Sequence, residues 1–355
     1  MTEMSPPQQR TPRVSVVIPV YNGPQLLHQA LTSVLAQSWR DFEVVVVDDA
    51  STQDIAGVVG GLGDARVHLL RNAVNAGVAA SHNRGVEAAA ADLIAIMDSD
   101  ELMHPQRLAQ QVDYLDRNPE VAVVGTAYVP LDRVTGAPKR PVYNPLKPQR
   151  VRSELLFRCA LHRPTVMARA AVLRAFPSDT RYGHAHDYAD WVHIADHHSL
   201  ANLPQVLGTY RKHSTNITSV HRTQTEAHRS VLVREMLLRL GVEPSDEDLR
   251  KHIALAAKVY DGERLYADAD YLEWASRWLS RLLAANRDAS VYPQDALQQT
   301  AASVWLALCL RARRRIGPTA VARWAAKGPA GGMLRAAGEL LKRQGSRRNW
   351  LRVGW

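Results

Sequence analysis

Three stretches of the sequence consist almost entirely of apolar residues, many of them β-branched, and each stops abruptly at polar ones. They are "VSVVIPV", followed by Tyr21 and Asn22; "FEVVVVDD", ending at Asp48 and Asp49; and "LIAIM", ending at Asp98-Ser99-Asp100. Apolar runs without alternation predict strands that are buried on both faces of a sheet. Helix-like segments separate them, so the sequence predicts an α/β fold with a mostly parallel, Rossmann-like sheet flanked by helices.

The polar residues that follow these strands predict one shared site. In parallel sheets of this class, ligands bind beyond the carboxyl ends of the strands. One site built from three strand ends is more economical than three unrelated turns. The acidic turn could alternatively be an ordinary surface turn, because Asp and Ser are frequent in turns.

The remainder of the chain predicts a helical extension. With 355 residues and 46% hydrophobic content, the chain can bury one sizeable core with an appendage, or two smaller domains. Segments such as "SVLVREMLLRL" and "YLEWASRWLSRLL" show helical spacing of apolar residues. We expect a disordered N-terminus at 1–12, the α/β domain at 13–222, a helical region at 223–310 and a basic helical tail at 311–355.

The net charge of +9 is concentrated in that tail. Residues 311–355 hold twelve Lys or Arg against one acid, Glu339, so the rest of the chain is close to neutral. A nucleic-acid-binding surface over the whole fold is therefore not indicated. The tail, which also carries Trp324, Trp350 and Trp355, is predicted either to contact anionic lipid at the membrane periphery or to be a solvated helical end.

The expected location is cytoplasmic. No stretch reaches the roughly eighteen apolar residues of a membrane helix, and the start "MTEMSPPQQRTP" has no secretory pattern. Cys159 and Cys309 lie far apart in the sequence and predict no disulfide framework.

The acidic turn suits a divalent cation and a nucleotide diphosphate. Mg²⁺ and Mn²⁺ take oxygen ligands and often keep substrate phosphates in their shell. The sequence contains no GxxxxGK[ST] phosphate loop, and the glycines of "GVVGGLGDAR" do not follow a strand with dinucleotide-binding spacing. The absence of these motifs argues against a kinase, an ATPase or a dehydrogenase.

Four motifs in order resemble the family 2 glycosyltransferases, inverting enzymes of GT-A fold that use nucleotide sugars. These are "VSVVIPVYNG", "FEVVVVDDAST", "NAGVAASHNRGVEAA" and "LIAIMDSDELMHPQRL". The resemblance continues through "LHRPTVMARAAVL", "HDYADWVHIA" and "LGTYRKHSTNIT", and so covers about residues 13–220.

The resemblance implies a set of donor-site residues. Pro19 and Tyr21 match positions where the first strand meets the nucleotide, and Asp49 matches the carboxylate that binds the base. Asn83 matches the Asn of the third motif, and Asp98 matches the residue near the ribose.

The same resemblance implies the metal ligands. Asp100 matches the ligand of a divalent cation, Mg²⁺ or Mn²⁺, and Glu101 is expected to support it. His213 matches a histidine that the GT-A fold brings to the metal or diphosphate from far along the chain, and Arg211 could help with the diphosphate charge.

Asp187, in "HDYADW", matches the catalytic base of the family's Glu-Asp motif, a role in which one carboxylate takes the proton of the acceptor hydroxyl. Two positions depart from the pattern. His186 stands where the family usually has Glu, and His82 stands where Arg is frequent. Because of His186, the sequence does not define the environment of the base. Because of His82, it does not decide whether His82 or Arg84 makes the anionic contact.

The expected function is a metal-dependent inverting glycosyltransferase that moves a sugar from a UDP-, GDP- or dTDP-sugar to the hydroxyl of a glycan or lipid-linked acceptor, in cell-surface polysaccharide or glycoconjugate assembly. A sugar-phosphate nucleotidyltransferase is the alternative enzyme, although "YNGPQLL" lacks the basic residues of its phosphate loop. A catalytically inactive nucleotide-sugar-binding protein is the non-enzymatic alternative.

Overall fold

The computed structural model describes residues 11–132, 135–211, 222–256 and 268–328, and these divide into two compact units. Unit 1 comprises residues 11–124, 163–177 and 207–209. Unit 2 comprises the described parts of 125–162, 178–206 and 210–328. His213, residues 1–10 and residues 329–355 lie outside the described residues.

Unit 1 contains the alternating strands and helices that the sequence predicts. Its elements are β1 (Val14–Val20), α1 (Pro24–Leu35), β2 (Phe42–Asp48), α2 (Ile55–Gly61), β3 (Val67–Arg71), α3 (Val78–Ala88), β4 (Leu93–Ile96), α4 (Arg107–Arg117), the start of β5 (Val121–Leu131), the short 3₁₀ turn η1 (Arg163–Thr165), β6 (Met167–Arg169) and α6 (Ala170–Ala175). The predicted α/β class is confirmed.

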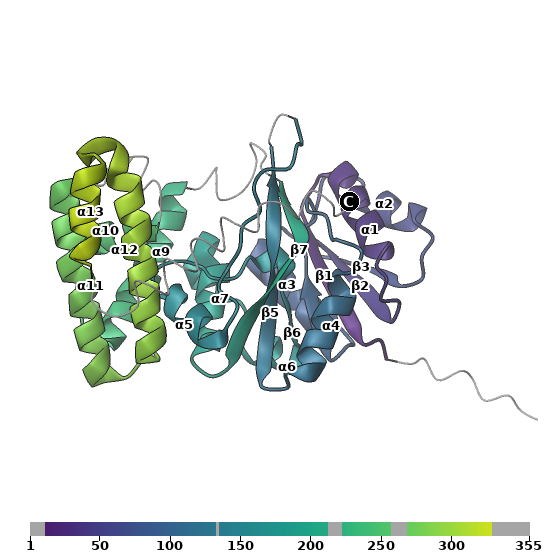
Figure 1. Cartoon of the computed structure of the whole chain (residues 1–355). Helices are drawn as coiled ribbons and strands as arrows, with labels where there is room; N and C mark the ends of the chain where they lie inside the picture. The colour runs from purple at the N-terminus through teal and green to yellow at the C-terminus, as the bar shows by residue number, and fades with distance from the viewer. Residues whose placement is uncertain (1–10, 133–134, 212–221, 257–267, 329–355) are drawn as a thin grey trace, which may run out of the picture. The chain divides into compact units, whose positions relative to one another are not determined.

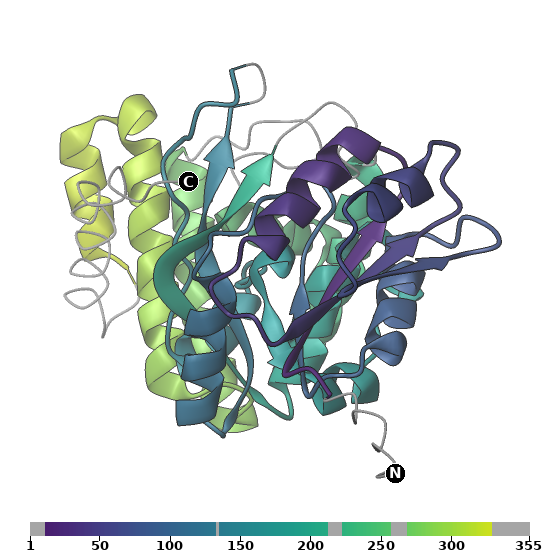
Figure 2. The ribbon, with the colours of Figure 1, turned by 90° about the vertical axis from the view of Figure 1, so that its right-hand side faces the viewer.

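The strands are parallel where the apolar runs predict it. β1 pairs in parallel with β2 and β4, and β2 pairs in parallel with β3, whereas β6 is antiparallel to β4 and β5. The sheet order is β3-β2-β1-β4-β6-β5-β7. Helices α1 and α3 lie on opposite faces of the β1 to β4 strands (Figure 2), so both faces are covered and the strands are apolar throughout.

Unit 2 combines two long strand segments with helices. Its elements are the rest of β5, α5 (Pro148–Leu155), the 3₁₀ turn η2 (Thr180–Ala185), α7 (His186–Ala195), most of β7 (Ser199–Arg211), α9 (Arg222–Arg239), α10 (Asp246–Ala256), α11 (Ala269–Ala289), α12 (Gln294–Ile316) and α13 (Pro318–Ala326). The chain turns back after β5, with bridges from Tyr128 to Val142 and from Leu131 to Pro138.

Helices α10 to α13 pack side by side as a bundle (Figure 1). Its core holds the large side chains Trp278 and Trp305, which are 3% and 0% exposed. The predicted amphipathic spacing of the C-terminal region therefore forms helices that bury their apolar faces. Across the described ranges, no helix combines the length and hydropathy that spanning a bilayer requires.

Candidate functional site

The loops that follow β1 and β2 in unit 1 are tied together by Asn22. This residue has a left-handed backbone conformation, with φ of 60°. Its side-chain oxygen accepts hydrogen bonds from the backbone of Thr52 and Gln53, at 3.0 and 3.2 Å, and the Ser51 hydroxyl accepts from its N–H at 2.8 Å. Asn tolerates this conformation better than most residues. The two strand ends are thereby held in one fixed arrangement.

Tyr21 and Pro19, the predicted nucleotide contacts on β1, differ in exposure. Tyr21 directly follows the strand and is 54% exposed. Pro19 is half-buried and is the second-last residue of the strand. A large aromatic side chain held open beside a rigid loop can stack on a planar ligand.

Asp49 lies buried at the end of β2, where its carboxylate holds the loop that leads into α3. Oδ1 accepts from the Asn72 side chain at 2.7 Å and from the Ala76 N–H at 2.8 Å, and Oδ2 accepts from the Gly77 N–H at 2.8 Å. Burial alone would raise the pKa of Asp49, but these bonds, with one from Ser81, outweigh it and keep the pKa below its usual range. Asp49 is therefore ionised and oriented; its contact with a base stays a prediction.

Asn72 is a residue that the sequence patterns did not single out. Its side chain donates to Asp49 and to the Ser81 hydroxyl, and its oxygen accepts from Arg84 at 2.5 Å. Asn72 follows β3, a fourth strand that ends in polar residues. This position at a strand end is the sequence feature that could have identified it. His82 is buried on α3 whereas Arg84 is exposed and bonded to this loop, so Arg84 is the better placed of the two for an anionic contact. Asn83, on the same helix, is half-buried.

The acidic turn follows β4 directly. Asp98, Ser99 and Asp100 are half-buried, whereas Glu101 is buried with 3% exposure. The Thr209 hydroxyl donates to Glu101 Oε2 at 2.9 Å and accepts from the Leu102 N–H at 2.8 Å. Glu101 thus anchors the turn and leaves the two aspartates at its rim.

Arg107, the first residue of α4, is a buried cation beneath this turn that sequence reasoning missed. Its side chain donates to the carbonyls of Pro164, Ile96 and Val166 at 2.6 to 2.9 Å and to Gln111 Oε1 at 2.9 Å. Burial lowers its pKa to about 9, and the charge of Asp98 partly offsets this. Arg107 therefore supplies positive charge close to Asp98. An Arg in an amphipathic helix ordinarily lies on the solvent-exposed face, so the sequence offers no reason to expect that Arg107 is buried.

The oxygens of this turn suit a hard divalent cation. Asp98 and Asp100 present carboxylates from one turn, the ligand type that Mg²⁺ and Mn²⁺ prefer. Within the described ranges, no three His, Cys, Asp or Glu side chains gather closely enough to form a metal site by themselves. The predicted partner of Asp100, His213, lies outside those ranges, so the ligand pair stays a prediction.

In unit 2, Asp187 lies in the first turn of α7. It is half-buried, and its Oδ1 accepts from the Tyr188 N–H at 2.8 Å. The Tyr188 hydroxyl in turn donates to the Leu155 carbonyl at the end of α5. His186 is 7% exposed, with Nδ1 at 2.8 Å from the Gly183 carbonyl. The residue that departs from the family pattern therefore fixes the turn that leads into α7.

Helix α9 supports the same turn from outside. The Tyr182 hydroxyl donates to Glu235 at 2.8 Å. Gly183 has φ of 44°, and a Cβ at this position would lie 2.4 Å from the His228 ring, so only glycine fits. Helix α9 thus belongs to the packing that positions Asp187.

The comparisons with known proteins find glycosyltransferases. Residues 15–179 match the family model described as Glycosyl transferase family 2. An uncharacterized glycosyltransferase from Haemophilus influenzae is 26% identical over 257 residues, which is 65% of this chain and 76% of that one. The Escherichia coli protein named UDP-Glc:alpha-D-GlcNAc-diphosphoundecaprenol beta-1,3-glucosyltransferase WfgD is 26% identical over 58% of this chain and 79% of its own length. Other curated relatives are longer, and the chain spans 33% of their length.

The fold has counterparts among solved structures. Staphylococcus aureus TarS 1-349, solved with UDP, superimposes with a TM-score of 0.54 at 17% identity, over 94% of this chain and 92% of that one. At this identity the likeness concerns the fold, and it agrees with the expected GT-A class.

Proposed function

Residues 15–179 match the model of glycosyl transferase family 2, and on that ground we propose that the protein belongs to this family and transfers a sugar from a nucleotide-diphosphate donor to an acceptor hydroxyl with inversion at the anomeric carbon. The observation that carries the proposal is the set of strand ends in unit 1. Tyr21, Asp49 and the Asp98–Asp100 turn follow three parallel strands, and hydrogen bonds hold each strand end in place.

On the donor side, Tyr21 stacks on the base, Asp49 reads its polar edge, and Pro19 and Asn83 border the nucleotide. Asp98 binds the ribose. The exposure of Tyr21 and the fixed carboxylate of Asp49 support these roles. The name of the E. coli relative favours a uridine nucleotide among the possible donors.

A bound Mg²⁺ or Mn²⁺ would supply charge that stabilises the departing diphosphate. Asp100 and His213 are the residues that would hold it, with Glu101 fixing the turn through Thr209. Arg107 partly offsets the negative charge that the turn concentrates.

Asp187 is the general base in this proposal. Its carboxylate takes the proton of the acceptor hydroxyl while the acceptor oxygen bonds to the anomeric carbon. The bond from that carbon to the diphosphate breaks, and the diphosphate leaves with the electron pair. Attack from the face opposite the leaving group inverts the configuration. The Tyr188 N–H orients the Asp187 carboxylate for this role.

The test separates binding from transfer. A thermal-shift screen of UDP-, GDP- and dTDP-sugars with Mn²⁺ identifies the donor, because a ligand that binds only the folded state raises Tm. Asp187→Asn is expected to keep the shift and to lower transfer by about 10²- to 10⁴-fold. Asp288→Asn, which removes an exposed carboxylate near the end of α11, is the matched control and should remain active.

Other outcomes assign the protein differently. A wild-type chain that binds a donor but transfers it neither to water nor to any acceptor is an inactive nucleotide-sugar-binding protein. Asp100→Ala should lose the Mn²⁺-dependent part of the shift, whereas the exposed Asp92→Ala should keep it.

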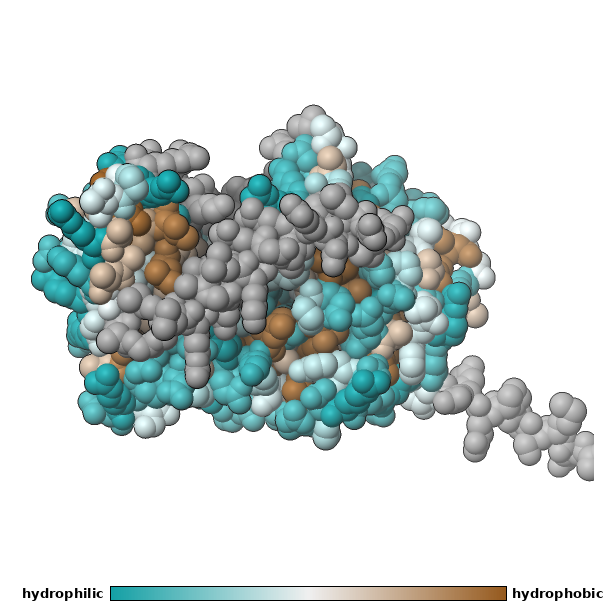
Figure 3. Space-filling model, in the orientation of Figure 1, coloured by the Kyte–Doolittle hydropathy of each residue, from teal (hydrophilic) through white to brown (hydrophobic). Residues whose placement is uncertain are grey.

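We also propose that the C-terminal region contacts anionic membrane lipid near a lipid-linked acceptor. Residues 311–328 contain six Lys or Arg and no acid. Lys327 lies 4.8 Å over the Trp324 ring, and Leu310 is 54% exposed. Apolar residues (brown) lie over α12 and α13 beside hydrophilic ones (Figure 3). Basic and aromatic side chains together suit a headgroup surface.

Vesicle flotation tests this contact. Arg313, Arg315, Arg323 and Lys327, all changed to Gln, should reduce flotation with phosphatidylglycerol vesicles, and phosphatidylcholine vesicles should bind neither chain. Equal flotation of both chains would contradict the proposal. The cytoplasmic location stays a prediction.

A further inference from the structure

Arg84 is an exposed residue of α3 whose guanidinium is bonded to the end of β3 and to the residue after it. Its Nη1 donates to the Arg71 carbonyl at 2.7 Å and to Asn72 Oδ1 at 2.5 Å. Both hydrogens of this nitrogen are thereby used, one on the backbone and one on a side chain. Arg84 therefore holds the end of β3 and the side chain of Asn72 together.

The bond from Arg84 decides which way the Asn72 amide points. A guanidinium can only donate, and the ionised Asp49 carboxylate can only accept. The amide oxygen must therefore face Arg84, and the amide nitrogen must face Asp49. That nitrogen donates to Asp49 Oδ1 at 2.7 Å and to the Ser81 hydroxyl at 2.9 Å, so both of its hydrogens are used as well.

Helix α3 gives Arg84 a rigid base. Ser81 and Arg84 are three positions apart, so they lie on the same side of the helix and both reach Asn72. Gly85 follows Arg84, and a Cβ at this position would lie 2.4 Å from a side-chain carbon of Val17 on β1. The helix is therefore packed directly against the sheet, and the Arg84 side chain starts from a fixed point.

The bonds that begin at Arg84 end at the Asp49 carboxylate. This carboxylate also accepts from the N–H groups of Ala76 and Gly77, both at 2.8 Å. Those two donors belong to the backbone of the loop, whereas the orientation of Asn72 depends on a side chain of the following helix. Without Arg84, the Asn72 amide can rotate and turn its oxygen toward Asp49, which replaces an attraction by a repulsion.

We propose that Arg84 is a positioning residue for nucleotide binding: it orients the Asn72 amide, and Asn72 orients the carboxylate of Asp49. Arg84 then acts through Asn72 rather than by direct contact with an anionic ligand, the role that its charge alone suggests. The inference rests on the proposed transferase function, in which Asp49 contacts the base. Its consequence is that an Arg84 variant loses affinity for the nucleoside part of the donor and keeps its affinity for the diphosphate.

Calorimetric titration of the full chain separates the two roles. The ligands are UDP, GDP and dTDP with Mn²⁺, and inorganic pyrophosphate with Mn²⁺. Arg84→Met should weaken binding of the preferred nucleoside diphosphate by about three- to tenfold, the usual range for groups in one hydrogen-bond network. Pyrophosphate binding should stay unchanged. The amide hydrogens of Ala76 and Gly77 should exchange about threefold faster or more, measured by mass spectrometry.

A double-mutant cycle tests whether Arg84 acts through Asn72. Asn72→Ala should weaken nucleotide binding by a similar factor. The addition of Arg84→Met to Asn72→Ala should cause no further loss, because the two residues act one through the other. Arg84→Lys retains a positive donor and should keep most of the affinity.

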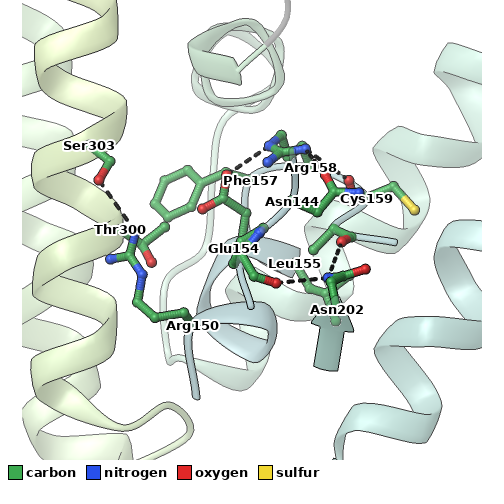
Figure 4. Close-up of polar contacts among 12 residues, drawn as sticks. Asn144, Arg150, Glu154, Leu155, Phe157, Arg158, Cys159, Asn202, Thr300 and Ser303 are labelled. Atoms are coloured by element: carbon green, nitrogen blue, oxygen red, sulfur yellow. Dashed lines mark hydrogen bonds and ion pairs between the residues drawn. The ribbon is translucent and has the colours of Figure 1, made fainter. Parts of the chain in front are cut away.

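Two other arginines provide matched controls. Arg40, exposed in unit 1, also donates to a carbonyl, that of Leu35 at 3.1 Å, and Arg40→Met should bind every ligand as the wild type does. Arg150 in unit 2 donates to the Ala296 carbonyl and to Ser303 Oγ on α12, at 3.4 and 3.3 Å (Figure 4). Arg150→Met should lower Tm without weakening nucleotide binding, which separates lost stability from lost positioning.

Three results would overturn the inference. They are an equal loss of pyrophosphate and nucleotide binding in Arg84→Met, a double variant that binds more weakly than Asn72→Ala alone, and unchanged exchange of the Ala76 and Gly77 amides. If these amides exchange faster in Arg84→Met but the wild type binds no nucleoside diphosphate, the link from Arg84 to Asp49 stands and the transferase function is the proposal that fails.

Discussion

The hydroxyl of Thr209 donates a hydrogen bond to the buried carboxylate of Glu101 at 2.9 Å while accepting one from the Leu102 N–H. Thr209, which lies 108 positions after Glu101 in the sequence, thereby fixes the acidic turn that follows β4. The bond holds the Glu101 carboxylate in the interior, whereas Asp98 and Asp100 are half-buried.

Thr209→Val should lower the free energy of unfolding by about 1 to 3 kcal/mol, because it removes the hydroxyl that bonds to the buried Glu101 carboxylate and to the Leu102 N–H. Thr209→Ser keeps the hydroxyl and should cost less. Urea unfolding of both variants measures the difference. Equal stabilities would show that the bond does not hold the turn.

Asp49 predicts a dependence of stability on pH. Its pKa is lower in the folded chain than the ordinary value of 3.8, so its contribution is present above about pH 4 and is lost as the pH falls through the folded-state pKa. Asp49→Asn should be less stable than the wild type at pH 7, and the gap should narrow toward pH 3. A gap independent of pH would contradict the role of ionisation. Asp92→Asn, at an exposed position, is the control.

His252 predicts a second pH effect in the helical bundle. Burial lowers its pKa from 6.5 to about 4, and the neutral ring bridges the Leu156 carbonyl and the Trp278 indole N–H. Because the unfolded chain takes up the proton first, stability should fall as the pH drops from about 6.5 to 4, by on the order of 3 kcal/mol.

His252→Gln should lose most of this slope between pH 7 and pH 5 in urea unfolding. His68, which is exposed in unit 1, provides the control: His68→Gln should keep the wild-type slope. A wild-type slope in the His252 variant would assign the effect to other groups.

The sheet could be predicted from sequence because apolar strands such as β1 and β2 are buried on both faces and show it in composition alone. The residues that hold the site in place could not be predicted from the sequence. Arg107 reaches Pro164 and Val166, which lie 57 and 59 positions away, and no local pattern signals such contacts. Asn72 was missed because the strand before it, β3, is interrupted by His68 and is not a continuous apolar run. The resemblance supplied Asp187, and only the folded chain brings Cys159 close to it.

That proximity makes the Cys159 thiol a reporter on Asp187. Burial and the charge of Asp187 both raise the pKa of Cys159, so little reactive thiolate forms at neutral pH and alkylation should be slow. Asp187→Asn removes the charge, lowers the thiol pKa and should accelerate alkylation by iodoacetamide at pH 8, measured by mass spectrometry of the peptide.

Two references make this measurement specific. Cys309 is buried in the helical bundle and should react at the same rate in both chains, which excludes general loosening. Asp288→Asn removes an exposed carboxylate of α11 in the same unit and should leave the Cys159 rate unchanged. If Asp187→Asn also leaves it unchanged, the charge of Asp187 does not influence the thiol.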